Sequence, residues 1–389
     1  MVEAKITVLH LSTHNEQCGI AIYQQNITDS MGHDRRIENV FFDISPNKLK
    51  VMPPAEFDAA LAKLLEQLQG FDILHIQHEY SFYNGDQLQK IVDGARQTGK
   101  KIMFTLHTPP HAHRRGIPRS APRGKHPRSW LHARRVAKDD TLFVASYLQP
   151  LQGADLLVTT SSVSIDSFAS YGVDPSKMRV VALPVPDTDK SQTSHEIAEK
   201  LHVQEGDTVL STVGFLSETK GIIPALKALC FLPQTYKLAL IGGSHPSGQN
   251  DDFYDQVCDT IVSLGLQDRV YITGYVDDDA RRDALVRETD ICLYPYDKGY
   301  YDYVSSAALT NAIANELPIV AYKTKTFQEA NDAVPFINFC QSANYYEIAR
   351  QVQVLDRQQS GERTQQYAKQ FSVAAQAAQF SQIYLELVS

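Results

Sequence analysis

A lysine next to a glycine, Lys220-Gly221, is the first place where residue types and spacing suggest chemistry. The apolar run 208–213 ends at Gly214, a polar loop leads to Lys220, and an apolar helical stretch follows at 222–232. A glycine at a strand end lets the backbone turn sharply and lets a ligand approach closely. The next helix directs free N–H groups and its positive dipole end at the loop. With the charge of Lys220 this suits a diphosphate; a Rossmann-type turn with a solvated lysine is the alternative.

Polar or ionisable residues also follow strand-like runs in the first half of the sequence. His78 and Glu79 come after 73–77, and His107 comes after 102–106. In α/β enzymes the functional groups lie at the carboxyl ends of the strands. His78 and Glu79 are therefore candidates for holding an acceptor hydroxyl, with a surface loop without a role as the alternative. A metal site at His107, His111 and His113 lacks the spacing of a known zinc motif.

The segment 111–138 contains nine Lys or Arg residues and no carboxylate, although the whole chain has a net charge of −8. Prolines keep its first part from being helical. Because unbalanced charge destabilises a fold unless something offsets it, we expect Arg114, Arg115 and their neighbours to face a phosphate-bearing acceptor or an anionic membrane surface. A solvated loop is the competing interpretation.

Five stretches, taken in order, resemble the retaining GT-B glycosyltransferases of glycosyltransferase family 4. The phosphate-loop pattern is V-G-F-L-S-E-T-K-G, ending at Lys220-Gly221. The other four are the residues 19–21, 105–107, 274–276 and 316–320. Each piece is weak alone, but the five together cover nearly the whole chain. The resemblance implies two Rossmann-like α/β domains with the ligand in the cleft between them.

The resemblance also implies roles for individual residues. Lys220, His107 and Glu79 would be catalytic, and His78 would bind the acceptor, together with Arg114 and Arg115, which the charge of their segment assigns to the same role. A nucleotide-diphosphate sugar would be the substrate, with no metal and no cofactor, and a phosphate oxygen would take the acceptor proton on the front face. The donor would be bound by Gly19, Gly214, Phe215, Gly243, Tyr275, Val276, Lys298, Tyr303, Val304, Ser305, Ser306 and Asn311.

Two departures from the family pattern affect the donor site. The two glutamates that most members carry eight residues apart are replaced by Tyr303 and Asn311, which leaves the small residues Ser305 and Ser306 before a helix. Phe215 stands where the family usually has an arginine on the diphosphate, and Lys298 is the nearest candidate to replace that charge. A non-catalytic GT-B subunit that binds a nucleotide sugar or a partner is therefore the alternative to an enzyme.

Composition and length limit the remaining choices. The 389 residues suit two domains, and the net charge of −8 argues against general nucleic-acid binding. The five cysteines form no C-x-x-C pair, which fits a reducing cytoplasm. We expect no signal peptide or membrane span, and thus a cytoplasmic protein with at most peripheral contact to the inner face of the membrane.

The alternation of short apolar runs with helical stretches predicts doubly wound parallel sheets. We expect an acceptor domain at 1–186, a donor domain at 187–364 and, at 365–389, a helix that crosses back onto the first domain. A metal-dependent GT-A transferase that uses Asp277, Asp278 and Asp279 is a weak further alternative, since that run is well suited to capping a helix. The function expected overall is sugar transfer from a nucleotide-diphosphate sugar to a glycan, lipid-linked or other phosphate-bearing acceptor.

Overall fold

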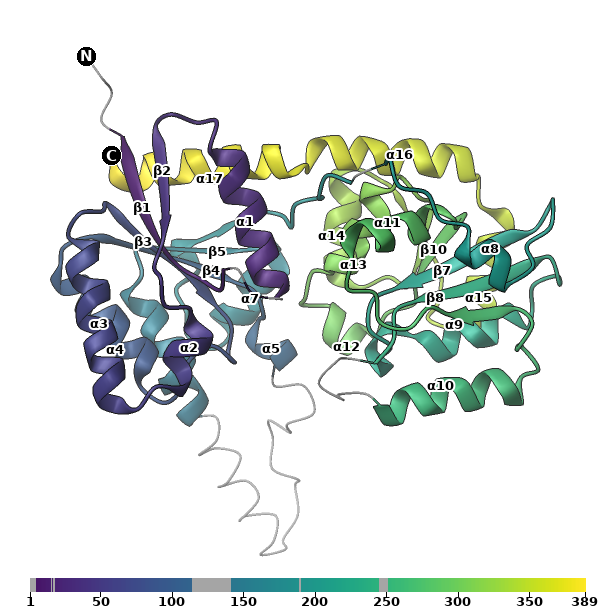
Figure 1. The fold of residues 1–389 in the computed structure, drawn as a ribbon, viewed down its shortest axis with the longest axis horizontal. Helices are drawn as coiled ribbons and strands as arrows, with labels where there is room; N and C mark the ends of the chain where they lie inside the picture. The colour runs from purple at the N-terminus through teal and green to yellow at the C-terminus, as the bar shows by residue number, and fades with distance from the viewer. Residues whose placement is uncertain (1–4, 15, 17, 114–140, 189, 245–250) are drawn as a thin grey trace, which may run out of the picture. The chain divides into compact units, whose positions relative to one another are not determined.

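The computed structural model describes residues 5–14, 16, 18–113, 141–188, 190–244 and 251–389. The chain forms two α/β units, which Figure 1 shows as a ribbon. The first unit comprises Met1–Ala182 together with Val373–Ser389, and the second comprises Leu183–Ser372. The predicted segment of nine cations, including Arg114 and Arg115, lies almost wholly outside the described residues.

The sheet of the first unit is parallel, in the strand order β2-β1-β3-β4-β5-β6. Its strands are β1 (Ile6–Leu11), β2 (Ile37–Phe41), β3 (Ile73–His78), β4 (Lys101–Leu106), β5 (Leu156–Thr159) and β6 (Met178–Val180). The order reverses between β1 and β3. In open parallel sheets the crevice at such a reversal is where ligands bind.

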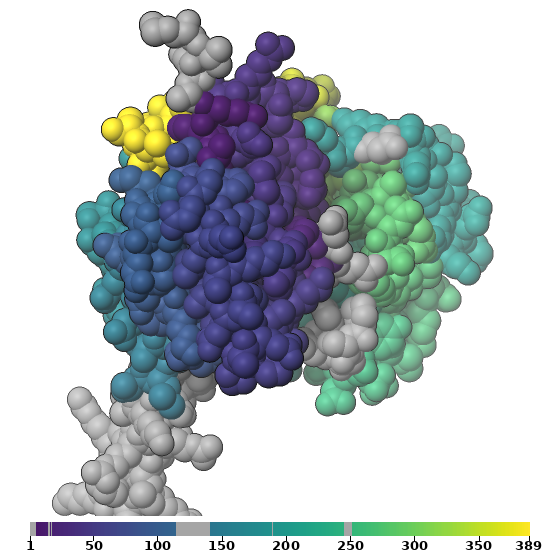
Figure 2. All heavy atoms as spheres, turned by 60° about the vertical axis from the view of Figure 1, so that its left-hand side comes forward, coloured from purple at the N-terminus to yellow at the C-terminus, as the bar shows by residue number. Residues whose placement is uncertain are grey.

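The helices of the first unit cover both faces of this sheet. They are α1 (Gly19–Met31), α2 (Pro46–Val51), α3 (Pro54–Leu68), α4 (Gln87–Gln97), α5 (Pro110–His113), α7 (Ser162–Ala169) and α17 (Val373–Val388), with shorter turns η1 (Val144–Leu148), η2 (Gln149–Gly153) and η3 (Pro175–Lys177). The C-terminal α17 packs along α1 and against β1. Figures 1 and 2 show its end beside the first strand.

The two faces of this sheet differ in polarity. Leu74 and Ile76 of β3 point into an apolar core that includes side chains of α3 and α4. The alternate residues His75 and Gln77 are equally buried and lie on the opposite face, where His75 contacts Tyr384 of α17. Successive side chains of a strand point to opposite faces of the sheet, so apolar and polar residues that alternate along β3 give the sheet one apolar face and one polar face.

The second unit repeats the architecture with the parallel order β12-β11-β10-β7-β8-β9. Its strands are β7 (Thr208–Val213), β8 (Tyr236–Ile241), β9 (Val270–Ile272), β10 (Ile291–Tyr294), β11 (Ile319–Ala321) and β12 (Ile337–Phe339). The order reverses between β7 and β10, so this unit also has a switch point at the carboxyl ends of its strands.

Two apolar cores enclose this second sheet, and successive residues of its strands alternate between them. Leu238 and Leu240 of β8 enter the core beneath α9, α10 and α15, while Ala239 and Ile241 enter the core beneath α11, α13 and α16. The helices are α8 (Glu196–Lys200), α9 (Ile222–Leu229), α10 (Asp251–Ser263), α11 (Asp279–Arg287), α12 (Lys298–Tyr301), α13 (Ala307–Ala314), α14 (Lys325–Ala333), α15 (Tyr345–Val354) and α16 (Arg357–Gln370), with the turn η4 (Glu218–Lys220).

The last stretch of the chain is not one continuous helix, as its spacing predicts, but two. Helix α16 ends at Gln370 and α17 begins at Val373. At the break the backbone N–H of Val185 donates to the carbonyl of Phe371, at 2.8 Å. Val185 and Ser372 also form an isolated parallel bridge. The chain therefore leaves the second unit through a strand-like contact.

Candidate functional site

The loop between β7 and α9 holds a lysine that has no hydrogen-bond or ion-pair partner within the described residues. Lys220 is half-buried, and its ammonium lies against Gly214: a Cβ added to Gly214 would be 2.3 Å from Lys220 Nζ. Gly214 has φ +99°, which side chains rarely adopt. Burial lowers the pKa of Lys220 to about 8. Because this partly buried ammonium has no negatively charged partner among the described residues, binding of an anion beside it is favourable.

Close backbone approaches hold this loop in place and explain one glycine within it and one in the neighbouring loop after β8. A Cβ on Gly221, at φ +66°, would come within 1.9 Å of the carbonyl oxygen of Pro295, beyond β10. A Cβ on Gly242, beyond β8, would come within 2.2 Å of the carbonyl oxygen of Gly214. Three strand ends therefore pack together through backbone atoms, which fixes where the loop places Lys220.

The first turn of α13 lies at the same place. The Cβ position of Gly214 is 3.8 Å from Cβ of Ala308, in that first turn. Ser306 is the N-cap, and its Oγ accepts from the backbone N–H of Leu309, at 3.2 Å. The first N–H groups of a helix and a positive side chain together are suited to binding a phosphate group.

Phe215, in the same loop as Lys220, packs against a second aromatic residue. Its ring stacks on the ring of Tyr275, with centroids 5.7 Å apart and planes 6° from parallel. Tyr275 is 46 % exposed and follows Gly274 after β9. A Cβ on Gly243 would lie 2.8 Å from the backbone nitrogen of Tyr275. The structure thus brings Phe215, Gly243 and Tyr275 together, with Val276 next in sequence.

The residues between β10 and α13 have different surroundings. Lys298 is exposed at the start of α12. The ring of Tyr303 lies under Lys325 Nζ, 5.5 Å from its centroid, and the carbonyl of Val304 accepts from the hydroxyl of Thr326, at 3.4 Å. Ser305 is half-buried directly before the cap of α13.

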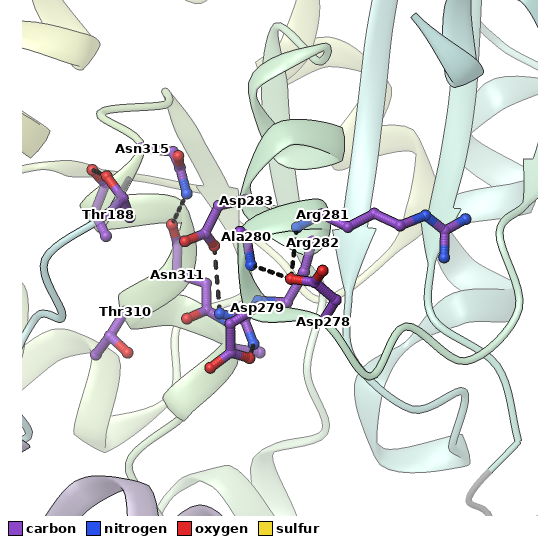
Figure 3. Close-up of polar contacts among 12 residues, drawn as sticks. Thr188, Asp278, Asp279, Ala280, Arg281, Arg282, Asp283, Thr310, Asn311 and Asn315 are labelled. Atoms are coloured by element: carbon purple, nitrogen blue, oxygen red, sulfur yellow. Dashed lines mark hydrogen bonds and ion pairs between the residues drawn. The ribbon is translucent and has the colours of Figure 1, made fainter. Parts of the chain in front are cut away.

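Asn311 lies on α13 opposite α11, as Figure 3 shows. Its carbonyl accepts from Nδ2 of Asn315, at 2.8 Å, and Asn315 Oδ1 accepts from Arg287, at 2.9 Å. At the start of α11, the Asp278 carboxylate accepts from the backbone N–H groups of Ala280 and Arg281, at 2.8 and 3.1 Å. The expected capping role of the aspartate run is confirmed, and the GT-A alternative is wrong because the fold has two Rossmann-like units.

In the first unit, His107 follows β4 and is fixed by two neighbours. Its Nε2 lies 2.6 Å from Gln77 Oε1. Since a carbonyl oxygen only accepts, Nε2 carries the hydrogen. The ring also meets that of Tyr23 edge-on, with centroids 5.3 Å apart. Burial, and secondarily the charge of His78, lower the pKa of His107 to about 3, so the ring is neutral at ordinary pH.

Glu79 and His78 lie on different sides of the strand end. Glu79 is half-buried and accepts from the hydroxyl of Thr108 at 2.6 Å, while burial raises its pKa. His78 is fully buried on the apolar face and meets the rings of Tyr80 and Phe104 edge-on. The structure does not bring His78 to the face that carries His107.

The remaining candidates of the first unit are spread out. Gly19 begins α1, and open space surrounds the position of its missing Cβ. His111 Nδ1 lies 2.8 Å from the hydroxyl of Ser167, and the His113 ring stacks on Phe143. Among residues the structure describes, no three His, Cys, Asp or Glu side chains converge as a metal site would require. None of the described helices is both long and apolar enough to cross a membrane.

Family models match both units. The model described as Glycosyltransferase Family 4 matches residues 23–189, and the model described as Glycosyl transferases group 1 matches residues 193–371. Together the two matches span most of the chain. It belongs to the family 4-like glycosyltransferases with the GT-B fold. The predicted family and fold are thereby confirmed.

Solved structures of other glycosyltransferases share the fold of this one. Anabaena HepE in complex with UDP has a TM-score of 0.67 at 16% identity, covering 98% of this chain and 100% of its own. Sucrose-phosphate synthase from Thermosynechococcus elongatus has 0.67 at 16%, covering 98% and 99%. A glycosyltransferase from Rickettsia africae has 0.66 at 14%, covering 99% and 99%. No curated protein matches the sequence significantly.

Sequence reasoning missed one group of residues in this glycosyltransferase. His10, Gln24, His75 and Gln77 are buried polar residues on the face of the first sheet that leads to His107. The signal was present: polar residues interrupt the apolar strands at alternate positions, as in L-H-I-Q-H at 74–78. Their partners lie far away in sequence, so the strands alone did not reveal them.

Proposed function

We propose that this glycosyltransferase is a retaining enzyme that moves a sugar from a nucleotide-diphosphate sugar to a glycan, lipid-linked or other phosphate-bearing acceptor, without a metal. The observation that carries the proposal is the Lys220 ammonium, which has no hydrogen-bond or ion-pair partner among the described residues and lies against Gly214, close to the first turn of α13. A cation and free helix N–H groups are suited to the charge that builds on a leaving diphosphate. Interactions that strengthen as this charge develops lower the barrier of the reaction.

Other residues take supporting roles in this proposal. The pair Phe215 and Tyr275, packed against Gly243, lies on the side of the loop where the nucleotide base would bind. In this proposal His107 contacts the transferred sugar. Glu79 is an ionisable group close to His107, since the two residues follow the neighbouring strands β3 and β4 at the same edge of the sheet. A phosphate oxygen of the donor takes the acceptor proton, as the resemblance to the retaining family implies. Acceptor binding by Arg114 and Arg115, and membrane contact through their segment, stay predictions.

Donor hydrolysis tests the proposal because many transferases release sugar to water without an acceptor. Purified protein is first screened by thermal shift with UDP, GDP, ADP and CMP and with their sugars. A ligand at one hundred times its Kd should raise the free energy of unfolding by about 2.7 kcal/mol. The selected nucleotide sugar is then incubated with wild type and with Lys220→Met. Release of free sugar of unchanged anomeric configuration by wild type alone supports the proposal, and unchanged rates in EDTA support metal independence.

A non-catalytic subunit is the second candidate, favoured by the side chains at the family's glutamate and arginine positions. Tyr303 and Asn311 carry no charge, and Phe215 is stacked on Tyr275. The same assay separates the two candidates. Stabilisation by a nucleotide sugar with no hydrolysis and no transfer to any acceptor would indicate the subunit, whereas turnover would exclude it.

A further inference from the structure

Five polar side chains form a continuous row through the first unit, from His107 to the half-exposed Asn39. Gln77 Oε1 lies 2.6 Å from His107 Nε2, and Gln77 Nε2 donates to Gln24 Oε1. Gln24 Nε2 lies 3.1 Å from His10 Nδ1, and His10 Nε2 lies 2.9 Å from Asn39 Oδ1. The strands β1, β2 and β3 and the helix α1 each contribute one member of the row, and His107 directly follows β4. Gln24, Gln77 and His10 are at most 1 % exposed.

The row has a direction because each of its inner members donates at one end and accepts at the other. An amide oxygen only accepts and an amide nitrogen only donates, while a neutral imidazole has one nitrogen of each kind. His10 therefore accepts at Nδ1 and donates from Nε2 to Asn39. His107 donates from Nε2 to Gln77, and its Nδ1 is left as an acceptor that makes no hydrogen bond to a described residue.

A side branch at Gln77 is compatible with this direction. The Gln77 amide nitrogen also lies 3.4 Å from Nε2 of His75, which accepts its second hydrogen when the His75 hydrogen is on Nδ1. His75 Nε2 also lies 2.8 Å from the hydroxyl of Thr105, and His75 Nδ1 lies 2.7 Å from the Tyr384 hydroxyl. With the Gln77 amide turned around, its oxygen would face Gln24 Oε1 and lose that bond.

Burial keeps the histidines of the row neutral, which the alternation of donors and acceptors requires. It lowers the pKa of His10 to about 4 and that of His107 to about 3. It also lowers the pKa of His75 well below its usual range. Each ring thus has one N–H and one free lone pair at neutral pH.

We propose that Gln77 is a positioning residue of the transferase: it holds the hydrogen of His107 on Nε2 and so leaves Nδ1 to accept a hydrogen bond from a hydroxyl of the bound sugar. The inference rests on the proposed contact of His107 with the sugar. Gln77 itself touches neither substrate. Gln77 acts only by fixing the tautomer and orientation of the His107 ring. Replacing a residue with a purely structural role would leave both of these unchanged.

The tautomer of His107 is measured by NMR on protein labelled with ¹⁵N at its 13 histidines. The His107 signals are assigned as those missing from His107→Gln. Wild type should show His107 as a single tautomer, with a slowly exchanging hydrogen on Nε2. In Gln77→Leu, or in Gln77→Met if the leucine variant does not fold, the ring should become a mixture of tautomers and lose that slow exchange.

Binding of UDP and of UDP-glucose then tests the consequence. Gln77→Leu should leave the Kd of UDP unchanged and raise that of UDP-glucose about three- to tenfold, the effect of one neutral hydrogen bond. Thr105→Val is the matched control. Thr105 is equally buried on the same face but bonds only to the His75 branch, so its variant should keep both the His107 tautomer and the UDP-glucose affinity.

The outcomes separate the positioning role from the proposed function. A hydrogen on Nδ1 in wild type, or a His107 tautomer and exchange rate unaffected by Gln77→Leu, would overturn the proposal. Equal weakening of UDP and UDP-glucose would also overturn it, because a structural role predicts that. If wild type binds neither ligand, the binding comparison is made with the nucleotide sugar that the thermal-shift screen selects, while the NMR measurement decides by itself whether Gln77 orients His107.

Discussion

Replacing Lys220 by methionine removes the charge of the β7–α9 loop and keeps most of the side-chain stem. Loss of one preorganised donor to a developing anion costs about 2.7–4 kcal/mol, or roughly 10²–10³ in kcat. The usual arginine position holds Phe215, so no second cation of that loop shares the role within the described residues. We therefore expect Lys220→Met to lie at the slow end of this range.

Although Lys220→Met should be much less active than wild type, its free energy of unfolding should be equal or higher. Burial lowers the pKa of Lys220 from 10.5 to about 8, so the folded protein binds its proton more weakly than the unfolded chain does. Below pH 8 the lysine is charged in both states, and burying the charge lowers the free energy of unfolding by its full amount. This penalty disappears as the pH rises towards 10.5, so the free energy of unfolding increases across that window. At pH 7 the shift corresponds to at most roughly 3 kcal/mol. Lys220→Met should thus unfold at an equal or higher urea concentration than wild type.

Nucleotide binding should depend on the same proton. A diphosphate beside Lys220 favours the charged form, so the Kd of the nucleoside diphosphate selected by the thermal-shift screen should be constant below pH 8 and weaken by up to about tenfold per pH unit above it. Titration calorimetry in buffers of different ionisation enthalpy would then detect proton uptake at pH 9. Lys227→Met is the matched control, since Lys227 is exposed on α9 and lies over the Tyr345 ring.

Two results would refute this reasoning. Near-normal turnover in a folded Lys220→Met protein would remove the basis for placing the diphosphate at the β7–α9 loop. Proton uptake that persists in Lys220→Met would assign the titration to a different group. The Lys227→Met control guards against a general effect of net charge, because it changes the total charge by the same amount.

Three further predictions concern the second unit. Phe215→Arg should tighten binding of the nucleoside diphosphate selected by the thermal-shift screen at least about tenfold by a charge-assisted hydrogen bond, and an unchanged Kd in a folded variant would show that Phe215 does not face the diphosphate. Gly221→Ala should lower the free energy of unfolding by well over 1 kcal/mol more than Gly99→Ala, because both have positive φ but only Gly221 meets a carbonyl; equal urea midpoints would contradict this. Asp278→Ala should cost about 1 kcal/mol in thermal unfolding as a lost N-cap, and no change would mean that the cap is dispensable.

The strands of the second unit could be predicted closely from the sequence. The run 208–213 before the lysine loop is a strand with these same bounds, and the similar short apolar runs 291–294 and 319–321 are strands as well. They are short, apolar and bounded by glycine, proline or polar residues, as buried parallel strands are. The edge strand Ile337–Phe339 was missed because three residues with a central asparagine carry little pattern.

The candidate site could be predicted only in part. The position of Lys220 after a glycine turn follows from local sequence, and so does the N-cap of α13 at Ser306. The side on which His78 lies depends on strand register, and the sequence around it did not fix that register. The partners of Gln77 and His75 come from α1 and α17, so they exist only once the fold has formed.

The first unit is completed by the last helix of the chain. Helix α17 covers α1 and supplies Tyr384 to His75, yet residues 183–372 are synthesised between the two parts. At about 5–20 residues per second, the ribosome needs roughly 10–40 s to make that insertion. During this delay the part of the polar face that α17 covers, around His75, stays open. A chain truncated before Val373 lacks α17 and leaves this part of the sheet exposed. We therefore expect such a chain to be bound by chaperones or degraded by proteases.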